Sequence, residues 1–209
     1  MDAIDPTRFL SALLKMGIDH YVSGKEEQPT LGLLEAKVAS CTKCALARSR
    51  KSVVFGEGSD HARLVFIGEA PGEEEDLQGR PFVGRAGKLL DQMIESIGLR
   101  RKEVYICNVL KCRPPGNRDP EPAEVDACKG YLVAQLETIR PALICTLGRH
   151  AYNTLLGVDA KITRIRGHLT DYKGIKLLPT YHPSFLLRNQ GAIGQAYEDM
   201  QKMKELLSV

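Results

Sequence analysis

The sequence predicts an α/β protein, a three-layer α/β/α sandwich with a central, mainly parallel four-stranded sheet. Three observations lead to this prediction. Short apolar runs recur from residue 63 onward, amphipathic segments lie between them, and 209 residues with 43% apolar side chains are enough for one well-buried core.

Residues 1–38 are expected to form an N-terminal helical extension, and residues 39–209 the main domain. Apolar residues recur at helical spacing in two stretches, 9–16 and 31–38, and the polar stretch 23–30 separates them. We therefore expect two helices joined by a linker ahead of the main domain.

The main domain contains four short apolar runs that are rich in β-branched or aromatic residues: 64–67, 104–107, 142–145 and 175–178. Such runs are typical of buried parallel strands. Between them, residues 84–97 and 122–139 carry apolar side chains at helical spacing, which indicates helices that cover the sheet. Ligands of such folds bind beyond the carboxyl ends of the strands, so the segments that follow the strands are candidates for function.

Composition limits the class of protein. The formal net charge is only +3, so a surface for nucleic acid has to be local. No apolar run approaches the roughly 20 residues that span a bilayer, and the start of the chain lacks the pattern of a secretory signal. We expect a cytoplasmic protein with no membrane partner, where six cysteines indicate a metal or redox site rather than disulfides.

The cysteines differ in their surroundings. The first two, Cys41 and Cys44, have the C-x2-C spacing that lets two thiolates face one metal. Two others lie inside apolar runs and are expected in the core: Cys107 and Cys145. The remaining two complete a four-thiolate site if they converge on the first pair: Cys112 and Cys128. Spacing does not separate zinc from an iron-sulfur cluster, and unrelated core thiols are the alternative.

Two residues after the first two strands have the chemistry to read a base. Phe82 lies in the glycine-rich stretch 79–84, where a ring can stack on a planar base, although a core anchor is the alternative. Asn108 ends an apolar strand, and a carboxamide can pair with N3–H and O4 of uracil, an edge that cytosine lacks. A strand-end cap is the alternative for Asn108.

The segment after the last strand combines a histidine with apolar and basic residues. His182 can stabilise charge on a departing anion, although most single histidines in loops have no such role. Either Leu186 or Leu187 can wedge into a base stack, while Ser184 and Arg188 meet phosphates.

Taken together these motifs resemble the family 4 uracil-DNA glycosylases, the thermophile-type members that contain an iron-sulfur cluster. The resemblance rests on residues 68–72 with Glu75 and Asp76, on the stretch 79–84, on Asn108 with residues 111–115, and on residues 182–184. It runs from about residue 41 to residue 189, and the first 38 residues lie outside it.

The resemblance implies a monofunctional uracil-DNA glycosylase that hydrolyses the N-glycosidic bond of deoxyuridine in single- or double-stranded DNA, acting as a monomer. It assigns catalysis to Glu69 and His182 and a pocket acid to Glu75. It implies a 4Fe-4S cluster held by four cysteines: Cys41, Cys44, Cys112 and Cys128. It implies contact with uracil from six residues: Gly68, Glu69, Ala70, Phe82, Asn108 and His182.

Two departures qualify the expected chemistry. Ala70 stands where well-known superfamily members have an aspartate that orients water, so Glu69 or backbone is expected to do so here. Residues 114–120 replace the basic, histidine-containing insertion of a related branch that captures DNA covalently, so covalent capture is not expected. The alternatives are a nonenzymatic iron-sulfur or zinc DNA-binding module and, less favoured, a redox protein.

Overall fold

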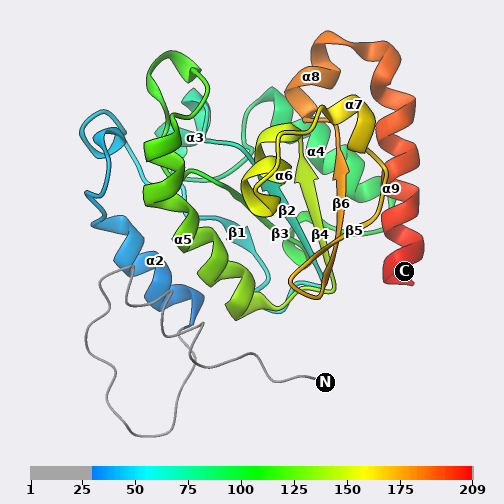
Figure 1. Ribbon diagram of the computed structural model, residues 1–209, viewed down its shortest axis with the longest axis horizontal. Coiled ribbons are helices and arrows are strands. Elements are labelled where there is room, and N and C mark those ends of the chain that lie inside the picture. Colours follow the sequence, from blue (N-terminus) through cyan, green and yellow to red (C-terminus); the bar gives the residue numbers. More distant parts are fainter. Residues whose placement is uncertain (1–29, 209) are drawn as a thin grey trace, which may run out of the picture.

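The computed structural model describes residues 30–208 (Figure 1). The helix expected in 9–16 lies outside the described residues, whereas the one expected in 31–38 is α2 (Leu31–Ala39). It begins where the polar stretch ends because Thr30 Oγ1 accepts a hydrogen bond from the backbone N–H of Leu33. Leu34 and Val38 of α2 are buried in the main core, and the division of the chain at residue 38 stays a prediction.

The sheet has six strands in the order β1-β3-β2-β4-β6-β5. The four predicted runs pair in parallel at its centre: β2 (Leu64–Gly68), β3 (Tyr105–Asn108), β4 (Leu143–Leu147) and β6 (Ile175–Thr180). The predicted number of strands was too low, because antiparallel strands lie at both edges: β1 (Glu57–Gly58) and β5 (Thr170–Tyr172). Strands of two and three residues are too short to show an alternating pattern.

Helices cover both faces of the sheet (Figure 1). One face packs against α2, α5 (Pro122–Ile139) and α6 (Arg149–Leu156), and the other against α4 (Arg85–Ser96), α8 (Pro183–Arg188) and α9 (Ile193–Leu207). Strand β2 is buried on both sides, and its side chains alternate between the two cores, Val65 facing the first and Phe66 the second.

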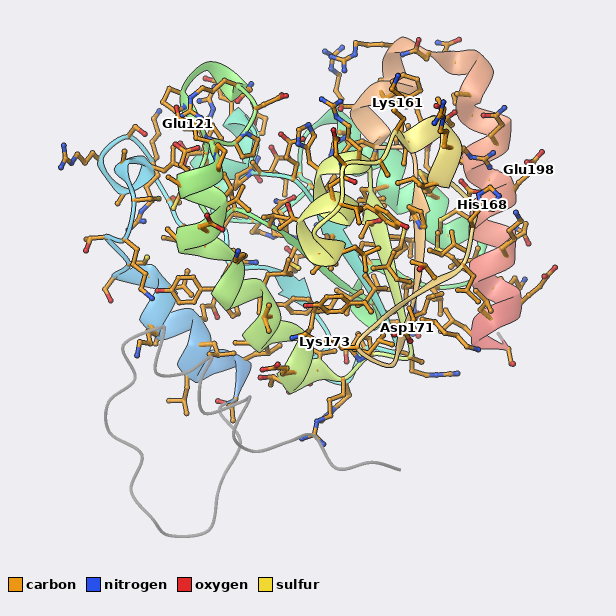
Figure 2. The ribbon with its side chains drawn as sticks, in the orientation of Figure 1. Glu121, Lys161, His168, Asp171, Lys173 and Glu198 are labelled. Carbon is orange, nitrogen blue, oxygen red and sulfur yellow. The ribbon has the colours of Figure 1, made fainter. Side chains whose placement is uncertain are left out.

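The remaining segments are short. They are α3 (Glu73–Gln78), α7 (Ile162–Ile165) and the 3-10 turns η1 (Ala45–Arg48), η2 (Arg101–Glu103), η3 (Pro115–Asn117) and η4 (Gln190–Ala192). Helix α8 forms within the segment after the last parallel strand, and Pro183 at its first position suits a helix start. Charged side chains such as Glu121 and Glu198 lie at the outer surface (Figure 2). No helix within residues 30–208 has the length and apolar character needed to cross a bilayer.

The strand order places a crevice at one end of the sheet. From β2 the chain moves to β3 on one side, and β4 then pairs with the other side of β2. Loops leaving the carboxyl ends of β2 and β4 therefore diverge, and ligands of open α/β sheets bind where this happens.

Candidate functional site

A pocket of about 730 Å³ opens at the carboxyl ends of the parallel strands. The segments after β2, β4 and β6 contribute to its wall, as does the last residue of β3. Eight of the residues predicted from the sequence line it: Glu69, Ala70, Glu75, Phe82, Asn108, His182, Ser184 and Arg188. The fold thus gathers most of the predicted site into one cavity.

Asn108 presents an unpaired acceptor at the pocket. The residue is 1% exposed, and its side-chain oxygen Oδ1 has no hydrogen-bond partner in the described part of the chain. A buried polar atom left unpaired costs about 1–3 kcal/mol, so such an atom calls for an explanation. Gly68 makes room for it, because a Cβ atom at Gly68 would lie 2.3 Å from Asn108 Oδ1 and 2.6 Å from Phe82 Cζ.

Phe82 and His182 form one wall of the pocket. Their ring centroids are 5.6 Å apart, with the ring planes inclined by 35°. Phe82 is buried although its backbone is left-handed, with φ of +50°. Both rings border the space that Asn108 faces, so a planar ligand there has an aromatic surface beside a hydrogen-bonding edge.

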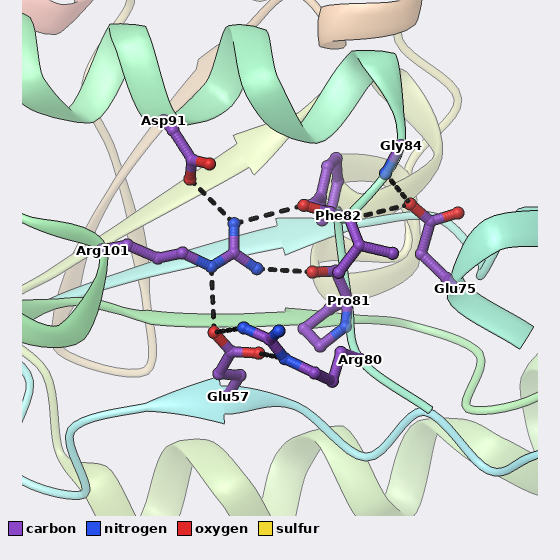
Figure 3. A network of polar contacts seen from close by, with 9 residues as sticks. Glu57, Glu75, Arg80, Pro81, Phe82, Gly84, Asp91 and Arg101 are labelled. Atoms are coloured by element: carbon purple, nitrogen blue, oxygen red, sulfur yellow. Dashed lines mark hydrogen bonds and ion pairs between the residues drawn. The ribbon is translucent and has the colours of Figure 1, made fainter. Parts of the chain in front are cut away.

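Glu75, the predicted pocket acid, joins two loops. One carboxylate oxygen accepts a hydrogen bond from the backbone N–H of Gly72 at 3.1 Å. The other accepts from the backbone N–H groups of Val83 at 2.9 Å and Gly84 at 3.0 Å (Figure 3). The loop after β2 is therefore tied to the segment that carries Phe82.

The imidazole of His182 is neutral and has a defined orientation. It caps the start of α8, and Nδ1 accepts the backbone N–H of Ser184 at 3.1 Å. An accepting Nδ1 places the ring proton on Nε2. Burial lowers the pKa of His182 to about 4, with the positive charge of Arg188 adding to the effect. His182 can therefore donate a hydrogen bond at neutral pH without carrying charge.

The carboxyl group of Glu69 has an unusual setting. Burial and the neighbouring charge of Asp119 raise its pKa to about 7, and Arg149 opposes the shift. His150 Nε2 lies 3.8 Å from a Glu69 carboxylate oxygen and 3.6 Å from one of Asp119. The sequence did not predict Asp119, Arg149 or His150 as neighbours of Glu69. Arg149 and His150 follow β4, so their position after a strand was the available signal.

The residues predicted to contact DNA separate into two groups. Ser184 Oγ lies 2.8 Å from His182 Nδ1, so it supports the histidine. Arg188 and Leu187 are exposed at the end of α8, Leu187 by 43%. Leu186 is fully buried in the core beneath α4 and α9, where it is not available to a ligand. Leu187 is thus the accessible member of the leucine pair.

Four of the six cysteines line a second, smaller cavity: Cys41, Cys44, Cys112 and Cys128. The chain arrives there from α2, from the loop after β3 and from α5. Two N–H donors bind its sulfur atoms. Arg50 Nη1 lies 3.2 Å from Cys112 Sγ, and the backbone N–H of Lys111 donates to Cys128 Sγ at 3.3 Å. Cys107 and Cys145 are buried in β3 and β4, as their apolar neighbours predicted.

Lys111 connects the cysteine cavity with the pocket. Its side chain is 1% exposed, and Nζ donates to the backbone oxygen of Asn108 at 2.8 Å and to Gln135 Oε1 at 2.5 Å. A buried ammonium needs such partners. The loop that carries Cys112 therefore also fixes the end of the strand that carries Asn108.

Comparison with known proteins gives a consistent result. A family model described as the uracil DNA glycosylase superfamily matches residues 55–207. A type-4 uracil-DNA glycosylase of Thermotoga maritima is 48% identical over 179 residues, which cover 84% of this chain and 93% of that protein.

Two further relatives extend the comparison. A type-4 uracil-DNA glycosylase of Saccharolobus solfataricus is 48% identical over 187 residues, or 85% of this chain and 87% of that protein. A type-5 uracil-DNA glycosylase of Pyrobaculum aerophilum is 31% identical over 153 residues, or 65% of this chain and 67% of that protein. The type-4 proteins are thus more similar to this chain than the type-5 protein.

Proposed function

This chain belongs to the uracil-DNA glycosylase superfamily, and on that premise we propose that it hydrolyses the N-glycosidic bond of deoxyuridine in DNA. It releases uracil and leaves an abasic site, the first step of base excision repair, without a covalent lysine intermediate. The observation that carries the proposal is the unpaired, buried Oδ1 of Asn108, which faces a pocket bordered by Phe82 and His182. Repair in the cytoplasm by a monomer, on single- or double-stranded DNA, is part of the same proposal.

Asn108 and Phe82 account for the choice of base. The C1' atom of deoxyuridine is hidden in duplex DNA, so the nucleotide must flip out at a cost of a few kcal/mol. In the pocket Phe82 stacks on the uracil ring, N3–H donates to Asn108 Oδ1, and the Asn108 amide donates to O4. Cytosine has no N3–H to satisfy Oδ1 and is rejected.

His182 stabilises the departing base. Negative charge develops on uracil as the glycosidic bond breaks, and a neutral imidazole that donates from Nε2 is preorganised to receive it. Glu69 orients the water that captures the sugar, because Ala70 has no polar side chain for that task. Gly68 completes the loop that touches uracil by leaving room for Asn108 and Phe82.

The four cysteines that share the smaller cavity are proposed to hold a 4Fe-4S cluster. The donor set fits, since four soft sulfur ligands share one cavity and two of them accept N–H groups, Cys112 from Arg50 and Cys128 from Lys111. A single zinc ion bonded to sulfur at ~2.3 Å would place the sulfurs about 3.8 Å apart. Among residues 30–208 no three cysteine sulfurs lie within 4.8 Å of one another. A bound cluster would cross-link three segments of the chain outside the larger pocket.

Contact with DNA is proposed to come from α8 and its start. Leu187, exposed at the end of α8, replaces the extruded nucleotide in the stack, and Arg188 meets a phosphate. Leu186, the other candidate wedge, is buried and is better explained as a core residue.

Oligonucleotides that contain uracil or thymine at one position test the proposed function. After incubation with the protein, alkali cleaves the strand at each abasic site. We expect cleavage of the uracil strand alone, in U:G and U:A duplexes and in single strands. Binding of both oligonucleotides without cleavage would instead support a nonenzymatic DNA-binding module.

The rate of uracil release is expected to depend on the ionisation of Glu69. Because burial and Asp119 raise its pKa to about 7, the single-turnover rate should rise with pH up to about 7 and then level off. Asp119→Asn removes a neighbouring negative charge and should move the rising limb to lower pH. Arg149→Gln removes a positive charge and should move it to higher pH. A rate unchanged from about pH 5 to pH 8 would contradict the role given to Glu69.

A further inference from the structure

The backbone of Phe82 adopts a conformation that a bulky side chain rarely has. Its φ is +50°, in the left-handed region, and it is one of five residues other than glycine in residues 30–208 with positive φ. Such a conformation persists only where the surroundings hold it. The residues that hold Phe82 therefore determine where its ring lies.

Arg101 binds the backbone carbonyl oxygens of Pro81 and Phe82 (Figure 3). Its Nη2 donates to the Pro81 oxygen at 2.5 Å, and its Nη1 donates to the Phe82 oxygen at 3.2 Å. A planar guanidinium can bridge consecutive carbonyls in this way, whereas an ammonium acts as a point charge.

Two carboxylates fix the guanidinium in turn. Arg101 Nε donates to Glu57 Oε1 at 2.9 Å, and Nη1 donates to Asp91 Oδ1 at 2.8 Å. The Arg101 side chain is only 19% exposed, so these ion pairs are partly shielded from water. The group is thus anchored to regular elements, to the edge strand β1 through Glu57 and to helix α4 through Asp91.

The backbone N–H groups that follow Phe82 are bound by the carboxylate of Glu75. Glu75 accepts the backbone N–H groups of Val83 and Gly84, while Arg101 takes the carbonyls of the two preceding residues. Helix α4 also packs closely against this segment. A Cβ atom at Gly87 of α4 would lie 1.8 Å from the backbone oxygen of Phe82. Unlike Glu75, Arg101 does not line the pocket.

We propose that Arg101 is a positioning residue for base binding, which acts by fixing the left-handed backbone of Phe82 and hence the face its ring offers to uracil. The inference rests on the proposed function, because it assumes that the ring stacks on the base. Because Arg101 lies outside the pocket, it would touch neither the base nor the sugar.

Arg101→Met tests the inference against a matched control, Arg80→Met. Arg80 bonds the same carboxylate, Glu57, at 2.7 and 2.9 Å, but its side chain is 57% exposed and it has no bond to the carbonyls around Phe82. We expect Arg101→Met to raise KM on uracil-containing DNA and the inhibition constant of free uracil by about tenfold. Arg80→Met should change both by less than about twofold.

A double-mutant cycle separates positioning from general stability. In the Phe82→Ala background, which has no ring to position, Arg101→Met should add little further loss. An equal additional loss in that background, or unchanged KM and uracil inhibition in Arg101→Met, would overturn the inference. If Arg101→Met does not fold, Arg101→Lys keeps the charge without the planar fork and enters the same cycle. Failure of the wild-type protein to release uracil would count against the proposed function instead.

Discussion

Asn108→Ala is expected to lower kcat/KM for uracil release by roughly 100-fold or more while the protein stays folded. In the proposed mechanism the amide supplies both hydrogen bonds that read the base, so truncation would leave N3–H and O4 of uracil without partners. Its effect on stability should be small. The Oδ1 atom of Asn108 is already unpaired, so removal of a buried polar group offsets the small cavity that alanine leaves.

Asn153→Ala is the control for this experiment. The Asn153 amide binds the backbone of Ala160 outside the pocket, so the same substitution there should leave kcat/KM unchanged. Asn108→Asp offers a second check, because a carboxylate accepts from N3–H but cannot donate to O4. It should also be strongly impaired. Wild-type activity in Asn108→Ala would remove the basis for the proposed reading of the base.

Cys112→Ala is expected to lower the yield of folded, iron-containing protein several-fold or more. The residue lies in the loop after β3, and loss of one proposed ligand would release the proposed cross-link between α2, that loop and α5. The fraction that does fold should retain a kcat within a few-fold of wild type, because the cysteines lie outside the pocket. Iron and sulfide content per folded chain measure the first effect, and single-turnover rates the second.

Cys145→Ala separates loss of the cluster from loss of a buried thiol. Cys145 is fully buried in β4 and lies outside the cavity that Cys41, Cys44, Cys112 and Cys128 line. Its truncation should cost about 1–2 kcal/mol of stability through poorer packing, with iron content per folded chain unchanged. Full iron content in Cys112→Ala would argue against its role as a ligand.

The central sheet could be predicted because its strands are buried on both faces. Residues such as Val65 and Phe66 give a continuous apolar run, which is a strong signal even in one sequence. The edge strands gave no such signal. The order of the strands depends on contacts between distant segments, and no local pattern encodes it.

The candidate site, like the sheet, could be predicted only in part. Asn108 and His182 became candidates because they stand at or just after the ends of strands, and the ends of parallel strands meet at one edge. Their expected roles came from the resemblance to a known family. The pair Leu186 and Leu187 was not resolved, since only the packing of α8 against α4 decides which of them is buried. Arg101 was missed because its role depends on the backbone of Phe82, nineteen residues earlier.

The two short antiparallel strands also limit how copies of the molecule can meet. A parallel sheet that ended in β3 or β6 would expose a row of unpaired N–H and C=O groups, a template for another chain. Here β1 covers one border with two residues and β5 covers the other with three. Each presents only a brief stretch of backbone to a neighbour, and the charged side chains of Glu57 and Asp171 stand on these strands. Sheet extension from one molecule to the next is therefore disfavoured, which protects the folded protein from aggregation at its edges.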